Sequence, residues 1–444
     1  MPNDIPRRAF VGEVAAASAM FHVVPRHVLG GGGRQAPSDT MNVACIGIGG
    51  MGASDVRGMS GENIYALCDV DDRRGAGSFN QFPQAKRYRD FRVMLERDGD
   101  AIDAITVSTP DHVHAVAAMM ALKMGKHVYC QKPLTRTIWE ARELARASRS
   151  AGVATQMGNQ GHSWEGTRQI REWVEAGWIG AVREVHYWTN RPIWPQAIER
   201  PLELYHVPQS LDWDLWLGPA PERPYHPAYA PFNWRGWWDF GTGALGDIAC
   251  HAMDAAFWAL DLGRPTRIEA DSTPLFEETA PAAARIVYEF PARGTRGPIR
   301  VVWRDGNLRP PRPTDLARDA QWPQGDSGQL WVGDEGSLLA GIYGENPRLV
   351  NEERHQALMA NPPDPTYPRT EGVYAEWIAA CKTGGRAGSD FAAHAGPLTE
   401  MVLLGNLAVR SAEALEIDAQ TGRVTNATIP EEYVRPVYRE GWSL

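Results

Sequence analysis

A glycine-rich turn between two apolar segments constrains the fold of this 444-residue chain more than any other feature. The apolar residues 43–46 lead into a Gly-x-Gly-x-x-Gly pattern, and a second apolar run ends at Asp69, 17 positions after Gly52. In dinucleotide-binding domains such glycines permit a tight turn, close approach of the backbone to a pyrophosphate, and packing of the next helix, while the acid binds the adenosine ribose. The pattern predicts a Rossmann domain with cofactor contacts at Gly47, Ile48, Gly49, Gly50, Met51, Gly52 and Asp69.

The order of predicted elements extends this domain and separates a second one from it. From Met41 to about residue 160, short apolar strands alternate with helices at the spacing of a parallel sheet, and Thr109 is the expected N-cap of a helix with Pro110 at its first position. Beyond residue 160 the strands are rich in β-branched residues and the helices include 246–260. We expect an N-terminal doubly wound α/β domain (41–160) and a C-terminal α+β domain (161–444) with an open, largely antiparallel sheet.

The first 40 residues differ in character from the rest of the chain. Arg7 and Arg8 precede a mostly apolar, alanine-rich run (14–24), which Pro25 ends. This arrangement resembles a twin-arginine export signal and predicts a periplasmic or exported protein. Because Glu13 interrupts the apolar region, a cytoplasmic protein with an N-terminal arm is the alternative.

Charge and side-chain spacing argue against several classes of partner. The net charge is −9 without a Lys/Arg-rich block, and no apolar run is long enough to span a bilayer, so we expect neither nucleic acid nor membrane as a partner. His112 and His114 form a His-x-His pair, but no third ligand follows at a suitable spacing, and we expect no metal site.

Other residues near the predicted strand ends are candidates for the cofactor cleft. Asp69 favours NAD over NADP, although Arg73 and Arg74 could hold a 2′-phosphate if they were not simply solvated. The carboxyl ends of parallel strands face the ligand in open α/β sheets. On that basis we assign Ser108, Thr109, Pro110, His112, His114 and Gln131 to the lining of the cofactor cleft, with helix capping as a second explanation for the two histidines.

Three residues could carry the chemistry of a dehydrogenase. Lys132 follows a predicted strand end and could bind a reacting hydroxyl or act as a base, or it could be a solvated surface lysine. Asp247 and His251 are four residues apart on a helix and face the same way, so the acid could orient the imidazole as a proton acceptor. A core histidine satisfied by a neighbouring acid has the same spacing.

Several motifs follow the order and spacing found in one known family. The set resembles the Gfo/Idh/MocA family (glucose–fructose oxidoreductase, inositol 2-dehydrogenase, MocA), except that Gln131 stands where the family carries Glu. This resemblance implies an NAD-binding Rossmann domain, catalysis by Lys132 with His251 and Asp247, and a homo-oligomer (dimer or tetramer) built on the second sheet. The loss of a charge at Gln131 is expected to lower the pKa of Lys132. The motifs are residues 47–52, Asp69, 109–114, 131–133 and 247–251.

Two further segments are candidates for substrate binding. Residues 158–162 and a tryptophan-rich insert (190–238) resemble a secreted bacterial branch of the family. Aromatic faces stack on the C–H faces of sugar rings, although tryptophans also build interfaces and small cores. We assign Asn159, His162, Trp237, Trp238 and Asp239 to substrate binding, and Trp213 and Trp216 to structure.

The leading functional hypothesis is an NAD-dependent oxidoreductase that transfers hydride between a nicotinamide and a hydroxyl carbon of a sugar, cyclitol or glycoside. A redox-neutral glycoside hydrolase or lyase that keeps its NAD through oxidation, elimination and reduction is the first alternative. A non-enzymatic sugar- or cofactor-binding protein is the second.

Overall fold

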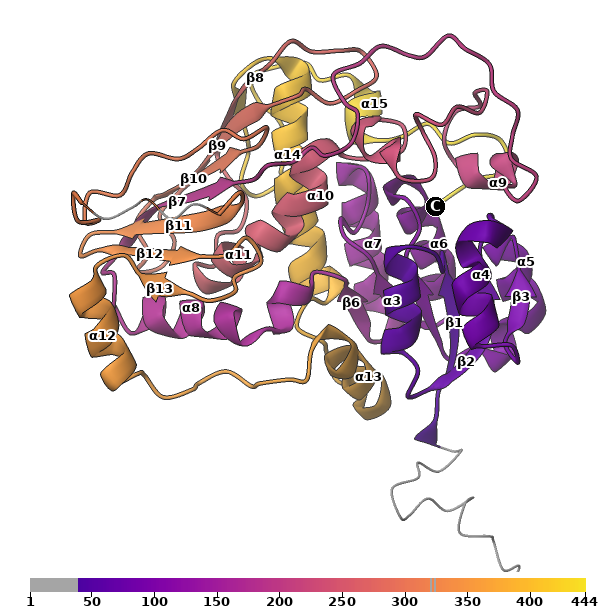
Figure 1. The fold of residues 1–444 in the computed structure, drawn as a ribbon, viewed down its shortest axis with the longest axis horizontal. Helices are drawn as coiled ribbons and strands as arrows, with labels where there is room; N and C mark the ends of the chain where they lie inside the picture. Colours follow the sequence, from indigo (N-terminus) through magenta and orange to yellow (C-terminus); the bar gives the residue numbers. More distant parts are fainter. Residues whose placement is uncertain (1–38, 320–321, 323–324) are drawn as a thin grey trace, which may run out of the picture.

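A computed structural model describes residues 39–319, 322 and 325–444 of the chain. The segment 1–38, which carries the twin-arginine-like motif, lies outside the described residues. The described chain forms two β-sheets placed side by side, with helices α10 and α14 between them (Figure 1). None of its helices is long and apolar enough to cross a membrane.

The first sheet has the strand order β3-β2-β1-β4-β5-β6, and all of its pairings are parallel. The order reverses at β1, so the carboxyl ends of β1 and β4 flank the crevice where doubly wound folds bind ligands. This confirms the predicted Rossmann fold. Its elements are β1 (Asn42–Ile46), α3 (Met51–Gly58), β2 (Asn63–Cys68), α4 (Asp72–Gln81), β3 (Lys86–Tyr88), α5 (Phe91–Asp98), η2 (Gly99–Ala101), β4 (Ala104–Val107), α6 (Asp111–Lys123), β5 (His127–Cys130), α7 (Ile138–Ala151) and β6 (Thr155–Met157).

Local chemistry explains how two helices of this domain begin. Thr137 caps α7, because its hydroxyl accepts from the Glu140 N–H and the Glu140 carboxylate accepts from the Thr137 N–H. The cap predicted for α6 is wrong by one residue: Pro110 is the N-cap, α6 begins at Asp111, and the Thr109 hydroxyl donates to the Pro110 carbonyl at 3.2 Å.

The second sheet has the order β13-β12-β11-β7-β10-β9-β8-β14 and is antiparallel except for the β7–β10 pair. The predicted open, largely antiparallel sheet is confirmed. Its strands are β7 (Val182–Trp188), β8 (Arg267–Ser272), β9 (Ala284–Phe290), β10 (Ile299–Arg304), β11 (Gly328–Gly333), β12 (Ser337–Ala340), β13 (Arg348–Leu349) and β14 (Leu415–Glu416).

The helices of the second half include one departure from prediction. The helix expected over 246–260 is two helices, α10 (Gly243–Ala252) and α11 (Asp254–Ala259), which meet at Met253. The remaining elements are η3 (Gln160–Ser163), α8 (Glu165–Glu175), α9 (Trp213–Leu217), η4 (Asn233–Gly236), α12 (Glu352–Ala360), α13 (Val373–Thr383), η5 (Phe391–Ala395), α14 (Gly396–Ser411) and α15 (Glu431–Val434).

The tryptophan-rich insert and the C-terminal tail both return to the Rossmann domain, and in Figure 1 the C-terminus lies beside α9 and α6. The Asp72 N–H donates to the Ser210 carbonyl at 3.0 Å, and the Asp212 N–H donates to the Val70 carbonyl at 2.9 Å. In the tail, the Trp442 ring packs 5.9 Å from that of Phe91. The insert therefore covers the end of β2, next to Asp69, and the tail covers the start of α5.

Candidate active site

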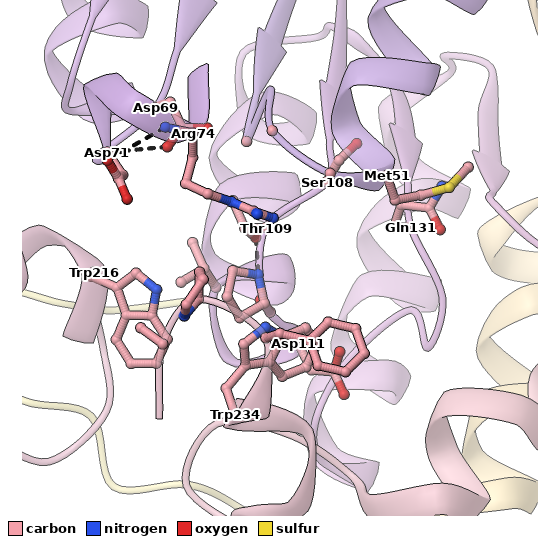
Figure 2. A pocket seen from close by; sticks show the side chains of 18 of the residues that line it. Met51, Asp69, Asp71, Arg74, Ser108, Thr109, Asp111, Gln131, Trp216 and Trp234 are labelled. Atoms are coloured by element: carbon pink, nitrogen blue, oxygen red, sulfur yellow. Dashed lines mark hydrogen bonds between the residues drawn. The ribbon is translucent and has the colours of Figure 1, made fainter. Parts of the chain in front are cut away.

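A single continuous cavity of about 790 Å³ lies between the Rossmann strand ends, the insert and helix α10. Its volume falls within the roughly 300–1,000 Å³ typical of ligand sites. Figure 2 shows Asp69, Arg74 and Ser108 on the Rossmann side of this cavity, with Trp216 and Trp234 on the side of the insert.

The glycine turn presents backbone to the cavity at Gly47, Gly49, Gly50 and Met51. Gly47 has φ +75°, and a Cβ there would lie 2.7 Å from the Ser108 backbone, so only glycine fits. The turn leads into the N-terminus of α3, which offers N–H groups to phosphates. These features fit the pyrophosphate of a dinucleotide.

Two members of the predicted cofactor motif lie behind the turn instead of in the cavity lining. Ile48 is fully buried, and its N–H donates to Asp69 Oδ2 at 2.9 Å. A Cβ at Gly52 would lie 1.9 Å from the Gly47 carbonyl oxygen, so this glycine allows α3 to approach the turn. We therefore assign Ile48 and Gly52 to support of the turn.

Asp69 lies in the cavity wall at the end of β2. Its Oδ1 accepts from the Asp71 N–H at 3.0 Å, which Figure 2 shows, so the carboxylate is fixed by backbone donors on both oxygens. Burial raises the pKa of Asp69, and the backbone hydrogen bonds oppose this shift. Arg73 and Arg74 are exposed, as expected for solvated residues, but both also line the rim of the cavity.

The two histidines of the His-x-His pair are absent from the lining of the cavity. The His112 ring contacts the Trp216 carbonyl at 2.9 Å, and the His114 ring contacts the Pro133 carbonyl at 2.8 Å. Burial lowers their pKa values to about 3 and about 4. These neutral rings attach α6 to the insert and to the Lys132 loop, whereas Ser108, Thr109, Pro110 and Gln131 do line the cavity.

Gln131 has a partner that the sequence did not suggest. Its Nε2 donates to both oxygens of Asp55, at 3.1 and 3.0 Å. The same carboxylate accepts from the Ser108 hydroxyl at 2.6 Å and from the Tyr374 hydroxyl at 2.7 Å. Burial raises the pKa of Asp55, and these hydrogen bonds counter it. The amide of Gln131 thus compensates a buried carboxylate of α3 and makes no side-chain contact with the Lys132 ammonium.

Lys132, Asp247 and Arg235 form one ionic cluster in the cavity wall. Lys132 Nζ donates to the Asp247 carbonyl at 2.8 Å and to Asp247 Oδ1 at 2.9 Å, and Arg235 Nε donates to the same Oδ1 at 3.0 Å. Burial would raise the pKa of Asp247, but the two cations outweigh it and hold the pKa below its usual range. An ammonium group has three protons, so Lys132 retains one donor for a ligand.

His251 lines the same cavity, but the structure corrects the expectation that Asp247 orients it. Asp247 is bonded to Lys132 and Arg235, and His251 Nδ1 is buried without a hydrogen-bond partner in the described chain. The ring packs 4.5 Å from that of Tyr343. Burial, followed by the charge of Lys132, lowers the pKa of His251 to about 3, so the imidazole is neutral at physiological pH.

Asp111 is a functional candidate that the sequence analysis overlooked. It is 3% exposed, lines the cavity at the start of α6, and accepts from the Thr242 hydroxyl at 2.8 Å. Burial raises the pKa of Asp111 to about 7, against the opposing charge of Lys132. Asp111 directly follows the predicted Thr109-Pro110 cap. This position, at the start of a helix that follows a strand of the parallel sheet, is the sequence signal that could have identified it.

Asn159 and His162 lie away from the cavity, in a second buried cluster. Asp254 accepts from Asn159 Nδ2 at 2.8 Å and contacts His162 Nδ1 at 2.9 Å and His394 Nε2 at 2.5 Å. The ligand atoms of His162, Asp254 and His394 lie within 4.8 Å of one another, a set that could hold a metal ion. Because the carboxylate is already compensated by these hydrogen bonds, we assign Asn159 and His162 to this cluster and not to substrate.

The aromatic residues that line the cavity differ from those assigned to substrate binding from the sequence. Trp237 is fully buried and donates to the Ala228 carbonyl, Trp238 lies under Arg410, and Asp239 pairs with Arg223, all outside the cavity lining. Trp216, expected to be structural, lines the cavity. The other aromatic residues in the cavity wall are Phe91, Trp164, Trp194, Tyr225, Phe232, Trp234, Tyr343 and Trp442.

Comparison with known proteins agrees with this geometry. The model of the NAD-binding Rossmann fold of an oxidoreductase family matches residues 41–159, and the model of that family's C-terminal alpha/beta domain matches residues 168–298. The chain therefore carries an NAD-binding Rossmann domain.

Individual relatives share only a modest sequence identity with this chain. An inositol 2-dehydrogenase of Salmonella paratyphi B is 27% identical over 153 residues, which cover 33% of this chain and 45% of the relative. A 1,5-anhydro-D-fructose reductase of Ensifer adhaerens is 27% identical over 207 residues, covering 46% and 51%. The chain spans about half the length of these curated relatives. The WlbA dehydrogenase from Bordetella pertussis, solved with NADH and UDP-GlcNAcA, shares the fold with a TM-score of 0.58 at 15% identity, over 85% of this chain and 99% of that one.

Proposed function

The chain belongs to the Gfo/Idh/MocA oxidoreductase family, and from this premise we propose that it is an NAD-dependent oxidoreductase acting on a hydroxyl carbon of a carbohydrate. One observation carries the proposal. Lys132, Asp247 and His251 share one cavity with the glycine turn and Asp69, although they come from different parts of the chain. The bound nicotinamide would supply the hydride acceptor.

Lys132 binds and polarises the reacting oxygen. Asp247 fixes the ammonium group through two of its three protons, and the third remains for the substrate oxygen. A positive charge held at this point stabilises the alkoxide that develops as the hydroxyl proton leaves. Asp247 acts through Lys132 and is therefore a positioning residue.

His251 accepts the hydroxyl proton. Its ring is neutral, and Nδ1 is inaccessible, so Nε2 is the atom through which it reaches a substrate. Tyr343 packs against the ring and fixes its plane. Proton transfer by such a positioned group contributes typically ~10²–10⁴-fold to the rate.

The test begins with the purified full-length protein. Denaturation and mass spectrometry identify any released nucleotide, and a panel of sugars, cyclitols and glycosides is then incubated with and without added NAD. We expect NAD binding and either NADH formation or a modified sugar detected by NMR. A protein that binds no NAD and changes no member of the panel contradicts the proposal.

A redox-neutral reaction is the second candidate, and the cover over the cofactor groove favours it. The insert is hydrogen-bonded to the Rossmann backbone at Val70 and Asp72, and Trp442 of the tail also lines the cavity. A dinucleotide under this cover would exchange slowly and could be oxidised and reduced within one turnover. Glycoside cleavage without NADH accumulation, by protein that retains NAD through gel filtration, distinguishes this candidate.

We also propose export through the twin-arginine pathway and assembly into a homo-oligomer. Arg7, Arg8 and the apolar run 14–24 support export, and the family resemblance supports a dimer or tetramer. Cell fractionation with N-terminal sequencing tests the first, and light scattering after gel filtration tests the second.

A further inference from the structure

Apart from the residues contributed by the ends of β2 and β3, the cavity lining holds more positive than negative charge. The cations in this part of the lining are Lys132, Arg191 and Arg235, and the carboxylates are Asp111 and Asp247. Asp247 is shared between Lys132 and Arg235 and can neutralise only one of them. The side chain of Arg191 bonds Asn190 and forms no ion pair with a carboxylate of the described residues.

The second acid offsets this excess only in part. Asp111 is buried and bonded to the Thr242 hydroxyl, and with a pKa of about 7 it is roughly half neutral at physiological pH. An excess of one to two positive charges in a partly closed cavity is costly unless a ligand compensates it.

Aromatic rings lie against Arg235 and His251. Arg235 lies over the rings of Trp234, Phe232 and Trp194, at 4.3, 4.5 and 5.7 Å from guanidinium carbon to ring centroid. On the other wall, Tyr343 links His251 to Trp164, whose ring is 6.0 Å away. The rings suit the C–H faces of a sugar, and a guanidinium group suits a carboxylate or phosphate.

We infer that the substrate is an anionic sugar, a pyranose-sized ring whose carboxylate or phosphate group binds Arg191 and Arg235 while its reacting hydroxyl meets Lys132 and His251. This inference rests on the proposed function and adds the substrate class. Binding of the anion compensates the charge excess, and the hydroxyl is presented to the catalytic pair by the same interaction.

The experiment compares matched substrates on NAD-loaded, full-length protein. Glucose is set against glucuronate and glucose 6-phosphate, galactose against galacturonate, and methyl glucoside against methyl glucuronide. Calorimetry measures binding, while NADH absorbance and NMR measure turnover. We expect one anionic class to exceed its neutral partner in kcat/KM by about 10- to 100-fold, the range of a charge-assisted hydrogen bond; the preferred anion then separates carboxylate from phosphate.

A substitution locates the anion site. Arg191→Met should raise KM for the anionic sugar by about 10- to 100-fold and change kcat much less, with little effect on the neutral partner. Arg423→Met, at an exposed arginine outside the cavity lining, is the matched control. Equal kcat/KM values for neutral and anionic partners, or an equal loss for both in Arg191→Met, overturn the inference but leave the oxidoreductase in place. Failure of every anionic sugar to bind also overturns it, and loss of all turnover together with NAD binding is the separate failure of the proposed function.

Discussion

Replacing Gln131 with Glu, the residue that the family pattern carries, should destabilise this protein. The Gln131 amide donates to both oxygens of Asp55 at about 3 Å, and both side chains are buried. A second carboxylate at that distance would repel Asp55 by about 5 kcal/mol at an effective dielectric constant of 20. The pair can instead take up one proton, which costs at most about 4 kcal/mol at pH 7 for a carboxyl of ordinary pKa.

The smaller of these two costs sets the expected effect. Since burial already raises the pKa of Asp55, protonation of the pair is cheaper than that limit, and we expect Gln131→Glu to lose about 2–4 kcal/mol at pH 7. The sign of the pH dependence follows from proton uptake. Above pH 4 the folded pair holds a proton that the unfolded chain releases, so the stability of the variant relative to wild type falls as pH rises, by up to about 1.4 kcal/mol per pH unit.

Thermal unfolding of the cofactor-free protein between pH 5 and pH 8 measures this effect. We expect a lowering of Tm by about 2–4 °C at pH 7 and a much smaller one at pH 5. The double variant Asp55→Asn/Gln131→Glu moves the single negative charge from position 55 to position 131 and should recover most of the lost stability. Gln84→Glu, at an exposed turn, serves as the control. An unchanged Tm for Gln131→Glu at pH 8, or no recovery in the double variant, would refute the reasoning.

Three further predictions concern the cavity itself. Lys132→Met should lower kcat by ~10²–10⁴ in steady-state assays, and near-normal turnover would reject its role. Because the pKa of Asp111 is raised to about 7, its ionisation removes positive charge from the cavity as pH rises, so KM for an anionic sugar should increase through pH 7; Asp111→Asn should flatten that profile, and an unchanged profile in the variant contradicts the assignment. Trp216→Ala should weaken NAD binding by about 3- to 10-fold in a fluorescence titration, since Trp216 lines the groove and stacks on Trp213 at 4.7 Å; equal affinity would place Trp216 outside the cofactor contacts.

The fold was predictable where the signal is local. The glycine turn, the strand–helix alternation and the Thr137 capping box each depend on residues within one or two elements, and each appears in the structure. The start of α6 and the break at Met253 were not predicted, because a single-residue shift of a cap and a bend inside an apolar helix leave the hydrophobic pattern almost unchanged.

The site was predictable in its members but not in their partners. Spacing on α10 shows that Asp247 and His251 share a helix face, but it cannot show that Lys132 and Arg235 arrive from other segments and take the carboxylate. Similarly, Trp238 is closer to Asp247 in sequence than Trp216 is, yet Trp216 lines the cavity. The insert has neither helical nor strand periodicity, so its sequence does not predict which aromatic side chains face the ligand.

The partners of Asp247 bear directly on how His251 can work. Had the carboxylate bonded the imidazole, it would have raised the pKa of His251 toward the operating pH and made the ring a stronger base. With Asp247 bonded to two cations, burial dominates and keeps the ring neutral, but a pKa of about 3 makes it a weak base. An anion bound at Arg191 and Arg235 would offset the cationic charge near His251 and move its pKa upward, toward the operating pH where a general base is most effective. Burial, and after it the charge of Lys132, therefore keeps the base weak, and a bound anion would offset only the second of these two causes.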